Sequence, residues 1–182
     1  MRIAVLTALA SASLVACGQN ATSTNNDVAE NSSNSVEATE SAATPAPTPS
    51  TKEEAMKVMH ERHEGMEQIG KSTKTIKRAL DSSSPDVAEI QKAAATIAEL
   101  AAKSPNWFPQ GTGPDLGKTG AKPEIWQNYP DFVSKDRDFG KAAQAFDAVA
   151  KTGDLTQIKS SFADLGKSCK ACHDKYRSDM HH

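Results

Sequence analysis

Residues 155–176 read LTQIKSSFADLGKSCKACHDKY, a stretch in which a helical apolar pattern carries two closely spaced cysteines. Its apolar residues recur at steps of three and four, which places them on one face of an α-helix: Leu155, Ile158, Phe162, Leu165, Cys169, Cys172 and Tyr176. The stretch follows Gly153-Asp154, which interrupts the preceding apolar pattern. It therefore predicts a helix that points both cysteines into the interior of a helical domain.

Two segments upstream show the same periodicity. The first follows Ser50, which forms a capping-box pattern with Glu53, and its stripe comprises Met56, Met59, His63, Met66, Ile69, Thr73, Ile76 and Leu80. The second starts at Ser84-Pro85, a cap followed by proline at the first helical position, and its stripe comprises Val87, Ile90, Ala94, Ile97 and Ala101. Each predicts an amphipathic helix.

A loop rich in proline and glycine, residues 104–122, follows the second helix. A structureless connection of this length is unusual unless it is anchored or functional. Trp107 and Phe108 are its expected anchors in the core.

The third helix is predicted to begin at Pro123-Glu124, and Pro130 inside its pattern predicts a kink or a break. Its apolar residues are Ile125, Tyr129, Phe132, Phe139, Phe146 and Val149. No segment alternates as a β-strand would. Residues 51–182 therefore predict an all-α domain, an antiparallel four-helix bundle.

The first residues resemble the signal of a bacterial lipoprotein. Residues 1–16 contain an early arginine and an apolar run, and they end in Leu-Val-Ala before Cys17. In lipoproteins the signal is cut before this cysteine, whose thiol receives a diacylglycerol; an ordinary signal peptide with an incidental cysteine is the alternative. Residues 17–50 lack aromatic residues, Leu, Ile, Lys and Arg, so we expect a disordered tether. The expected location is the periplasm, with a lipid anchor, and Gly18 favours the outer membrane.

The composition excludes several classes of protein. The formal net charge is −2 and the isoelectric point is about 6.2, whereas nucleic-acid-binding domains are usually basic. No apolar run reaches the roughly 18 residues of a membrane-spanning helix. Three cysteines, one alone and two close together, do not make a disulfide-stapled module. No catalytic acid–base pair, nucleophile arrangement or phosphate loop is recognisable, so the sequence predicts no classical enzyme.

The motif Cys169-Lys170-Ala171-Cys172-His173 carries the chemistry. Two thiols separated by two residues, with histidine immediately after, are typical of c-type haem attachment. Each thiol can add across one porphyrin vinyl group, and the adjacent imidazole then reaches one face of the iron. We predict one covalent haem c, with Cys169 and Cys172 as thioether anchors and His173 as axial ligand. Export agrees with this prediction, because bacteria attach haem c outside the cytoplasm.

Two haem-free alternatives stay open. A structural zinc site would need further ligands beyond the cysteine pair, and His60 and His63 could supply them. A thioredoxin-like redox pair would sit at a helix start after a strand, in a βαβ pattern that this sequence lacks.

From about Ala55 to Arg177 the chain resembles class II cytochromes c, the cytochrome c′ group. The resemblance is carried by the CKACH motif with Tyr176-Arg177 behind it, by Lys122-Pro123-Glu124-Ile125-Trp126, and by Arg62-His63-Glu64-Gly65-Met66 with Gly70. It implies a four-helix bundle with its haem near the C-terminus and His173 as the proximal ligand. It also implies that Arg62 pairs with a haem propionate. Arg177 would be a basic group near the proximal site, or simply a solvated charge at a helix end.

Met66 falls at the family's distal position. Six-coordinate members of the family have a methionine ligand there, and five-coordinate, gas-binding members have a bulky apolar residue. We expect Met66 to be the sixth ligand, with His63 as its rival and simple core packing of Met66 as the remaining reading. Met/His ligation suits electron transfer.

The predicted function is therefore that of a lipid-anchored, extracytoplasmic monohaem cytochrome that transfers single electrons. The alternative is a five-coordinate cytochrome c′ that binds nitric oxide or carbon monoxide. The expected partners are redox proteins, which the sequence does not identify, and the membrane reached through the lipid. The resemblance also allows a homodimer.

Overall fold

The computed structural model describes residues 46–178. The predicted signal at 1–16, the lipidated Cys17 and most of the tether at 17–50 lie outside the described residues. The described chain forms α1 (Lys52–Asp81), α2 (Val87–Lys103), the short 3₁₀-helix η1 (Ser104–Asn106), α3 (Glu124–Gln127), α4 (Tyr129–Ala150) and α5 (Leu155–Tyr176). The only pairing of β type among these residues is a single bridge between Ala121 and Arg177, so the predicted all-α architecture is confirmed.

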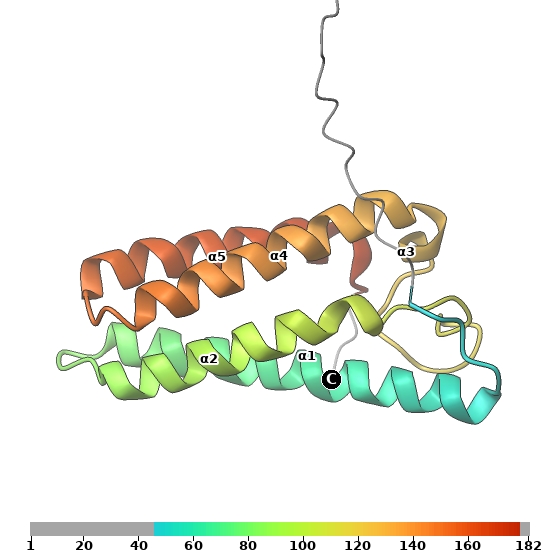
Figure 1. The fold of residues 1–182 in the computed structure, drawn as a ribbon, viewed down its shortest axis with the longest axis horizontal. Helices are drawn as coiled ribbons and strands as arrows, with labels where there is room; N and C mark the ends of the chain where they lie inside the picture. The colour runs from blue at the N-terminus through green and yellow to red at the C-terminus, as the bar shows by residue number, and fades with distance from the viewer. Residues whose placement is uncertain (1–45, 179–182) are drawn as a thin grey trace, which may run out of the picture. The chain divides into compact units, whose positions relative to one another are not determined.

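Four long helices make two antiparallel pairs (Figure 1). α1 packs against α2, α2 packs against α4, and α4 packs against α5. Within the described residues, α1 and α5 come close at far fewer points than these three pairs. The α1–α2 and α4–α5 turns lie at one end of the bundle, and the 104–122 loop lies with α3 at the other end (Figure 1).

The helix starts differ slightly from the predicted ones. α1 is capped by Thr51, whose hydroxyl accepts from Glu54 N at 3.1 Å, while the Glu54 carboxylate accepts from Thr51 N at 3.3 Å. The capping box predicted at Ser50 and Glu53 was therefore displaced by one residue. α2 is capped by Asp86 rather than Ser84, because the Asp86 carboxylate accepts from Glu89 N at 3.0 Å. The predicted start of α5 after Gly153-Asp154 is confirmed, and the structure shows that Asp154 is its cap.

The inner face of α1 is only partly the predicted one. Ile69, Ile76 and Leu80 are buried, but Met56 is 54% exposed and His63 is exposed. Buried positions also include the small or polar residues Ala55, Arg62, Gly65, Ser72 and Ala79. The prediction counted large apolar side chains, whereas small residues on this face permit neighbouring segments to come close.

The break predicted near Pro130 is present. Asn128, with φ −122° and ψ 44°, separates α3 from α4, and Pro130 occupies the first turn of α4. A proline is tolerated there because the first helical N–H groups have no partner within the helix. Trp107 and Phe108 are both 6% exposed, so the predicted anchoring of the loop is confirmed.

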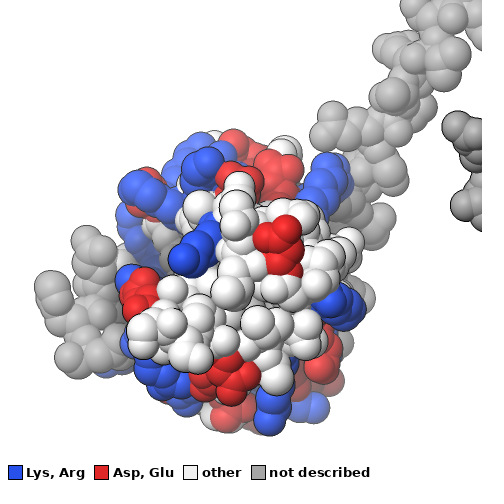
Figure 2. All heavy atoms as spheres, turned by 90° about the vertical axis from the view of Figure 1, so that its left-hand side faces the viewer, with Lys and Arg blue, Asp and Glu red and all other residues white. Residues whose placement is uncertain are grey.

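The outer surface carries charges of both signs. Figure 2 shows the end of the bundle with the two helix turns, where uncharged residues fill the centre and acidic and basic residues surround it. Within residues 46–178, no helix is both long enough and apolar enough to cross a membrane.

Candidate functional site

The cysteine motif occupies the last two turns of α5. Cys169 and Cys172 are free thiols and are half-buried, and both pack against the apolar core of the bundle. The sequence pattern predicted that they point inward, and their contact with the core agrees with it. Because α1 and α5 are not closely packed, this inner side of α5 is only partly covered by protein.

The electrostatics keep these thiols in their neutral form. Burial raises the pKa of the Cys169 thiol, and burial followed by the charge of Asp136 raises the pKa of Cys172 to about 11. Protonated thiols are poor metal ligands and poor nucleophiles, so this environment is unlike that of a reactive redox cysteine.

His173 follows the second cysteine and lies at the surface edge of α5. Desolvation of its ring, and then the charge of Arg177, lower its pKa, while Asp174 opposes them. A lowered pKa keeps the imidazole neutral near pH 7, and a neutral ring nitrogen is what a metal ion requires.

The zinc alternative finds no support in this geometry. Among residues 46–178, no three His, Cys, Asp or Glu side chains gather in a way that could hold a metal ion. His60 and His63 are both exposed on α1, and the His60 ring lies 3.1 Å from the Glu64 carboxylate. Neither histidine is brought to the cysteine pair.

Met66 lies midway along α1, half-buried and packed against the core. The residue before it, Gly65, is in contact with the indole of Trp107. A Cβ atom on Gly65 would stand 2.3 Å from Trp107 Cη2, closer than any ordinary carbon contact. Trp107 and Gly65 therefore fix the position of the loop against the helix turn that carries Met66.

Arg62, predicted to pair with a propionate, ties the loop to α1. Its Nη1 donates to Trp107 O at 3.0 Å and to Thr112 Oγ1 at 3.1 Å. Its Nη2 donates to Thr112 O at 2.9 Å and to Thr119 Oγ1 at 3.0 Å. The guanidinium also lies 5.1 Å from the centre of the Phe108 ring. Burial lowers the pKa of Arg62 to about 10, so it keeps its charge at neutral pH.

The end of the loop continues this connection to α5. Lys122 N donates to Tyr176 O at 3.0 Å, and Ser178 N donates to Gly120 O at 2.9 Å. The Trp126 indole N–H donates to Pro109 O at 3.0 Å from the side of α3. Segments far apart in sequence thus meet where Arg62 on α1 and the end of α5 contact one loop.

Sequence reasoning missed two groups of polar residues near the motif. Tyr176 O–H and Lys175 Nζ both donate to Asp131 on α4, the latter at 2.9 Å, and these bonds hold the pKa of Asp131 at about 2. Asp136, also on α4, is buried and lies 2.6 Å from Ser104 Oγ. Asp136 could have been found, because it falls between Phe132 and Phe139 on the inner stripe of its helix.

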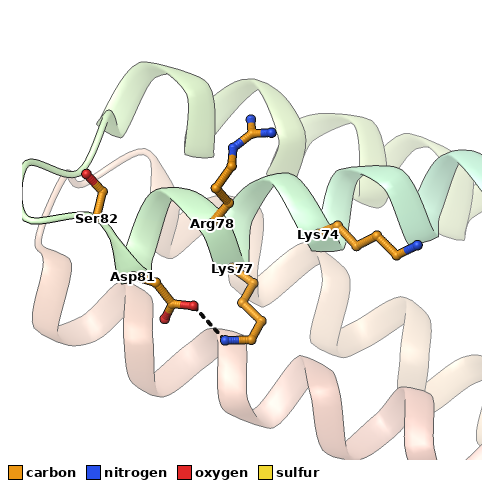
Figure 3. Close-up of a pocket in the computed structure, with 5 residues that line it drawn as sticks. All are labelled: Lys74, Lys77, Arg78, Asp81 and Ser82. Carbon is orange, nitrogen blue, oxygen red and sulfur yellow. Dashed lines mark hydrogen bonds and ion pairs between the residues drawn. The ribbon is translucent and has the colours of Figure 1, made fainter.

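The pocket in Figure 3 plays no part in this arrangement. It is a hollow beside the last turns of α1, lined by Lys74, Lys77, Arg78, Asp81 and Ser82, and Lys77 pairs with Asp81 at 2.6 Å. None of the predicted site residues lines it.

Comparison with known proteins identifies the family. A family model described as Cytochrome C' matches residues 57–177. The chain belongs to the cytochrome c′ family. Cytochrome c′ proteins bind one covalently attached haem c, so the predicted cofactor is confirmed and the protein is a haem c-type cytochrome. Two half-buried thiols separated by two residues, an adjacent neutral imidazole and an apolar inner surface fit such a group.

Individual relatives cover most of the helical domain. The cytochrome c′ of Allochromatium vinosum is 36% identical over 120 residues, which are 64% of this chain and 77% of the relative. A cytochrome c-556 of Agrobacterium tumefaciens is 36% identical over 119 residues, 64% of this chain and 94% of the relative.

Solved structures agree with the fold. The cytochrome c′ of Thermochromatium tepidum has a TM-score of 0.64 and 35% identity, and it covers 69% of this chain and 97% of its own. The cytochrome c′ of Shewanella frigidimarina has a TM-score of 0.65 and 34% identity, with 70% and 98% covered. The predicted four-helix bundle is thereby confirmed.

Proposed function

We propose that this cytochrome c′ family member is an extracytoplasmic electron carrier that passes single electrons between redox partner proteins. The observation that supports this proposal is Met66, a half-buried thioether on α1 beside the packed Gly65–Trp107 contact. A methionine at this position can close the distal side of the iron, and closed Met/His ligation suits electron transfer.

The roles of the other residues follow from their chemistry. Cys169 and Cys172 would hold the haem through thioether bonds, and His173 and Met66 would be the two protein ligands of its iron. The haem supplies a one-electron couple between ferric and ferrous iron. Arg62 would pair with a haem propionate, and its buried cation is held in place by its hydrogen bonds to the loop.

The spin state of the iron tests the role of Met66. Met66→Ala should convert a low-spin optical and electron paramagnetic resonance spectrum to a high-spin one. Met59→Ala is the matched control, because Met59 is half-buried on the same helix two turns earlier. An unchanged low-spin spectrum in Met66→Ala would reject Met66 as ligand, and His63→Ala would then examine the rival ligand.

A second candidate function is the binding of nitric oxide or carbon monoxide by five-coordinate iron. The family membership favours it, and one similar solved structure is the nitric oxide complex of a mutant cytochrome c prime from Alcaligenes xylosoxidans. It predicts a high-spin wild-type spectrum and prompt binding of carbon monoxide by the reduced protein. A low-spin protein that resists carbon monoxide would exclude it.

We also propose that residues 1–16 are a cleaved signal and that Cys17 is lipidated. Residues 17–50 would then tether the cytochrome domain, residues 51–182, to the periplasmic face of a membrane. The outer membrane is favoured. The motif Leu-Val-Ala-Cys supports this proposal. Cys17→Ser should release the haem protein from the membrane fraction. A variant that stays with the membrane would contradict lipid anchoring.

A further inference from the structure

A buried carboxyl group lies on α4 close to the haem-binding end of the bundle. Asp136 is 9% exposed, and its Oδ1 stands 2.6 Å from the hydroxyl of Ser104, which is fully buried at the end of α2. No part of the proposed electron transfer uses this pair. An ionised carboxylate is costly to bury, so its retention in an apolar face needs an explanation.

The hydroxyl of Ser104 has two neighbours but only one proton. Its Oγ lies 3.0 Å from Ala101 O and 2.6 Å from Asp136 Oδ1. The helical partner of Ala101 O would be the N–H of residue 105, and Pro105 has none. Ala101 O therefore needs the Ser104 proton.

The protonation state of Asp136 decides how many of these bonds form. If Asp136 is protonated, it donates to Ser104 Oγ, and Ser104 donates to Ala101 O, so both contacts are hydrogen bonds. If Asp136 is ionised, Ser104 can satisfy either the carboxylate or Ala101 O, but not both. This part of the fold therefore accommodates one additional proton without any rearrangement of the backbone. Burial also favours the protonated form, because it raises the pKa of Asp136.

The haem-binding helix lies within the electrostatic reach of this group. α4 packs against α5, and the charge of Asp136 acts on the thiol of Cys172. On α4, the titratable and charged groups around Asp136 are the Tyr129 phenol and the flanking Lys135 and Arg137. At the end of α2 lies Lys103, which is exposed and pairs with Glu99. From α5, Cys172 faces this group, and as a thioether in the holoprotein it does not titrate.

We propose that Asp136 binds a proton when the haem iron is reduced, so that this cytochrome couples electron transfer to proton uptake. The inference rests on the proposed function. Ferric iron becomes ferrous by gaining one electron from the redox partner, and the Asp136 carboxylate becomes a carboxylic acid by gaining one proton from water. Reduction removes one positive charge near the carboxylate, and the loss of that attraction raises its proton affinity.

The midpoint potential as a function of pH tests the coupling, measured by optical redox titration of the purified holoprotein. In the wild type the potential should fall with rising pH across one window, with a slope of up to about 59 mV per tenfold change in proton concentration. Asp136→Asn keeps the shape and can still donate to Ser104, so it mimics the protonated state. The midpoint potential of this variant should stay, throughout that window, at the value that the wild type has at low pH. Asp138→Asn, an exposed carboxylate on the same helix, should retain the wild-type curve.

Ser104→Ala supplies an independent reading. It removes two hydrogen bonds from the arrangement with protonated Asp136 but only one from the arrangement with ionised Asp136, so the falling segment should move to lower pH. The coupling would be refuted if the potential of Asp136→Asn fell with pH as steeply as that of the wild type. It would also be refuted if Ser104→Ala left the falling segment at the wild-type pH. Failure of the proposed function looks different, because the wild type would then show a high-spin spectrum and prompt binding of carbon monoxide, whatever the pH dependence of its potential.

Discussion

Gly65→Ala is a stringent test of how the loop is held against α1. The added Cβ would stand 2.3, 2.6 and 3.0 Å from three indole carbons of Trp107. Carbon atoms in favourable contact are about 3.5–4.0 Å apart, so the nearest contact is short by more than about 1 Å. Either the indole or the helix has to move.

Two routes of relief bound the cost. Swinging out the indole of Trp107, which is 6% exposed, would return roughly 150–250 Å² to water, or about 4–6 kcal/mol. Shifting the loop and helix apart resembles other overpacking changes, which cost about 1–3 kcal/mol. Alanine regains about 0.5–1 kcal/mol through its helix preference. We therefore expect Gly65→Ala to lower the free energy of unfolding by about 1–2 kcal/mol.

Gly70→Ala is the matched control, because Gly70 lies on the same helix and a Cβ there meets nothing within 4 Å. It should raise stability by about 0.5–1 kcal/mol. Denaturant unfolding of the holoproteins, followed by far-ultraviolet circular dichroism, measures both. If Gly65→Ala were as stable as Gly70→Ala, the close approach of Trp107 would be refuted. Adding Trp107→Phe, which has a smaller ring, should recover part of the loss in Gly65→Ala.

Three further changes test separate contacts. Arg62→Met strips the hydrogen bonds from the loop and leaves buried carbonyl groups unpaired, so it should cost at least about 2 kcal/mol and expose the loop to trypsin at Lys118; a loop still resistant to trypsin would contradict this role. Asp131 has its pKa depressed to about 2, so its ionised form adds stability above about pH 4 that disappears as the pH falls toward 2. Asp131→Asn should lack that acid loss, and an acid unfolding curve as steep as the wild type's would count against it. Thr51→Ala removes the cap of α1 and should cost about 0.5–2 kcal/mol in thermal unfolding, whereas an unchanged transition would show that the cap contributes nothing.

Local signals made the helices and the motif predictable. The two cysteines and His173 all lie in one helix, so spacing along the chain was sufficient to predict them together. The exchange of a predicted cap for its neighbour, as at Thr51, reflects side chains of nearly equal capping ability.

The missing parts depend on distant segments. Arg62 meets Thr112 and Thr119, which are 50 and 57 positions away, and no pattern along α1 specifies those partners. The prediction for the inner face of α1 was wrong at Met56 and His63, which are exposed. It also missed Gly65, which is buried because Trp107 packs on it and not because glycine is hydrophobic.

The loop between α2 and α3 also divides the chain into two complementary pieces. A cut at the exposed Asp115 would leave two helical hairpins that still share the α2–α4 interface, the Arg62–Thr119 bond and the bond from Trp126 to Pro109 O. One piece would carry Met66 and the other the CKACH motif. With Met66 as iron ligand, the low-spin spectrum would then develop only when both fragments bind each other. The optical spectrum would therefore measure the reassembly of the two fragments.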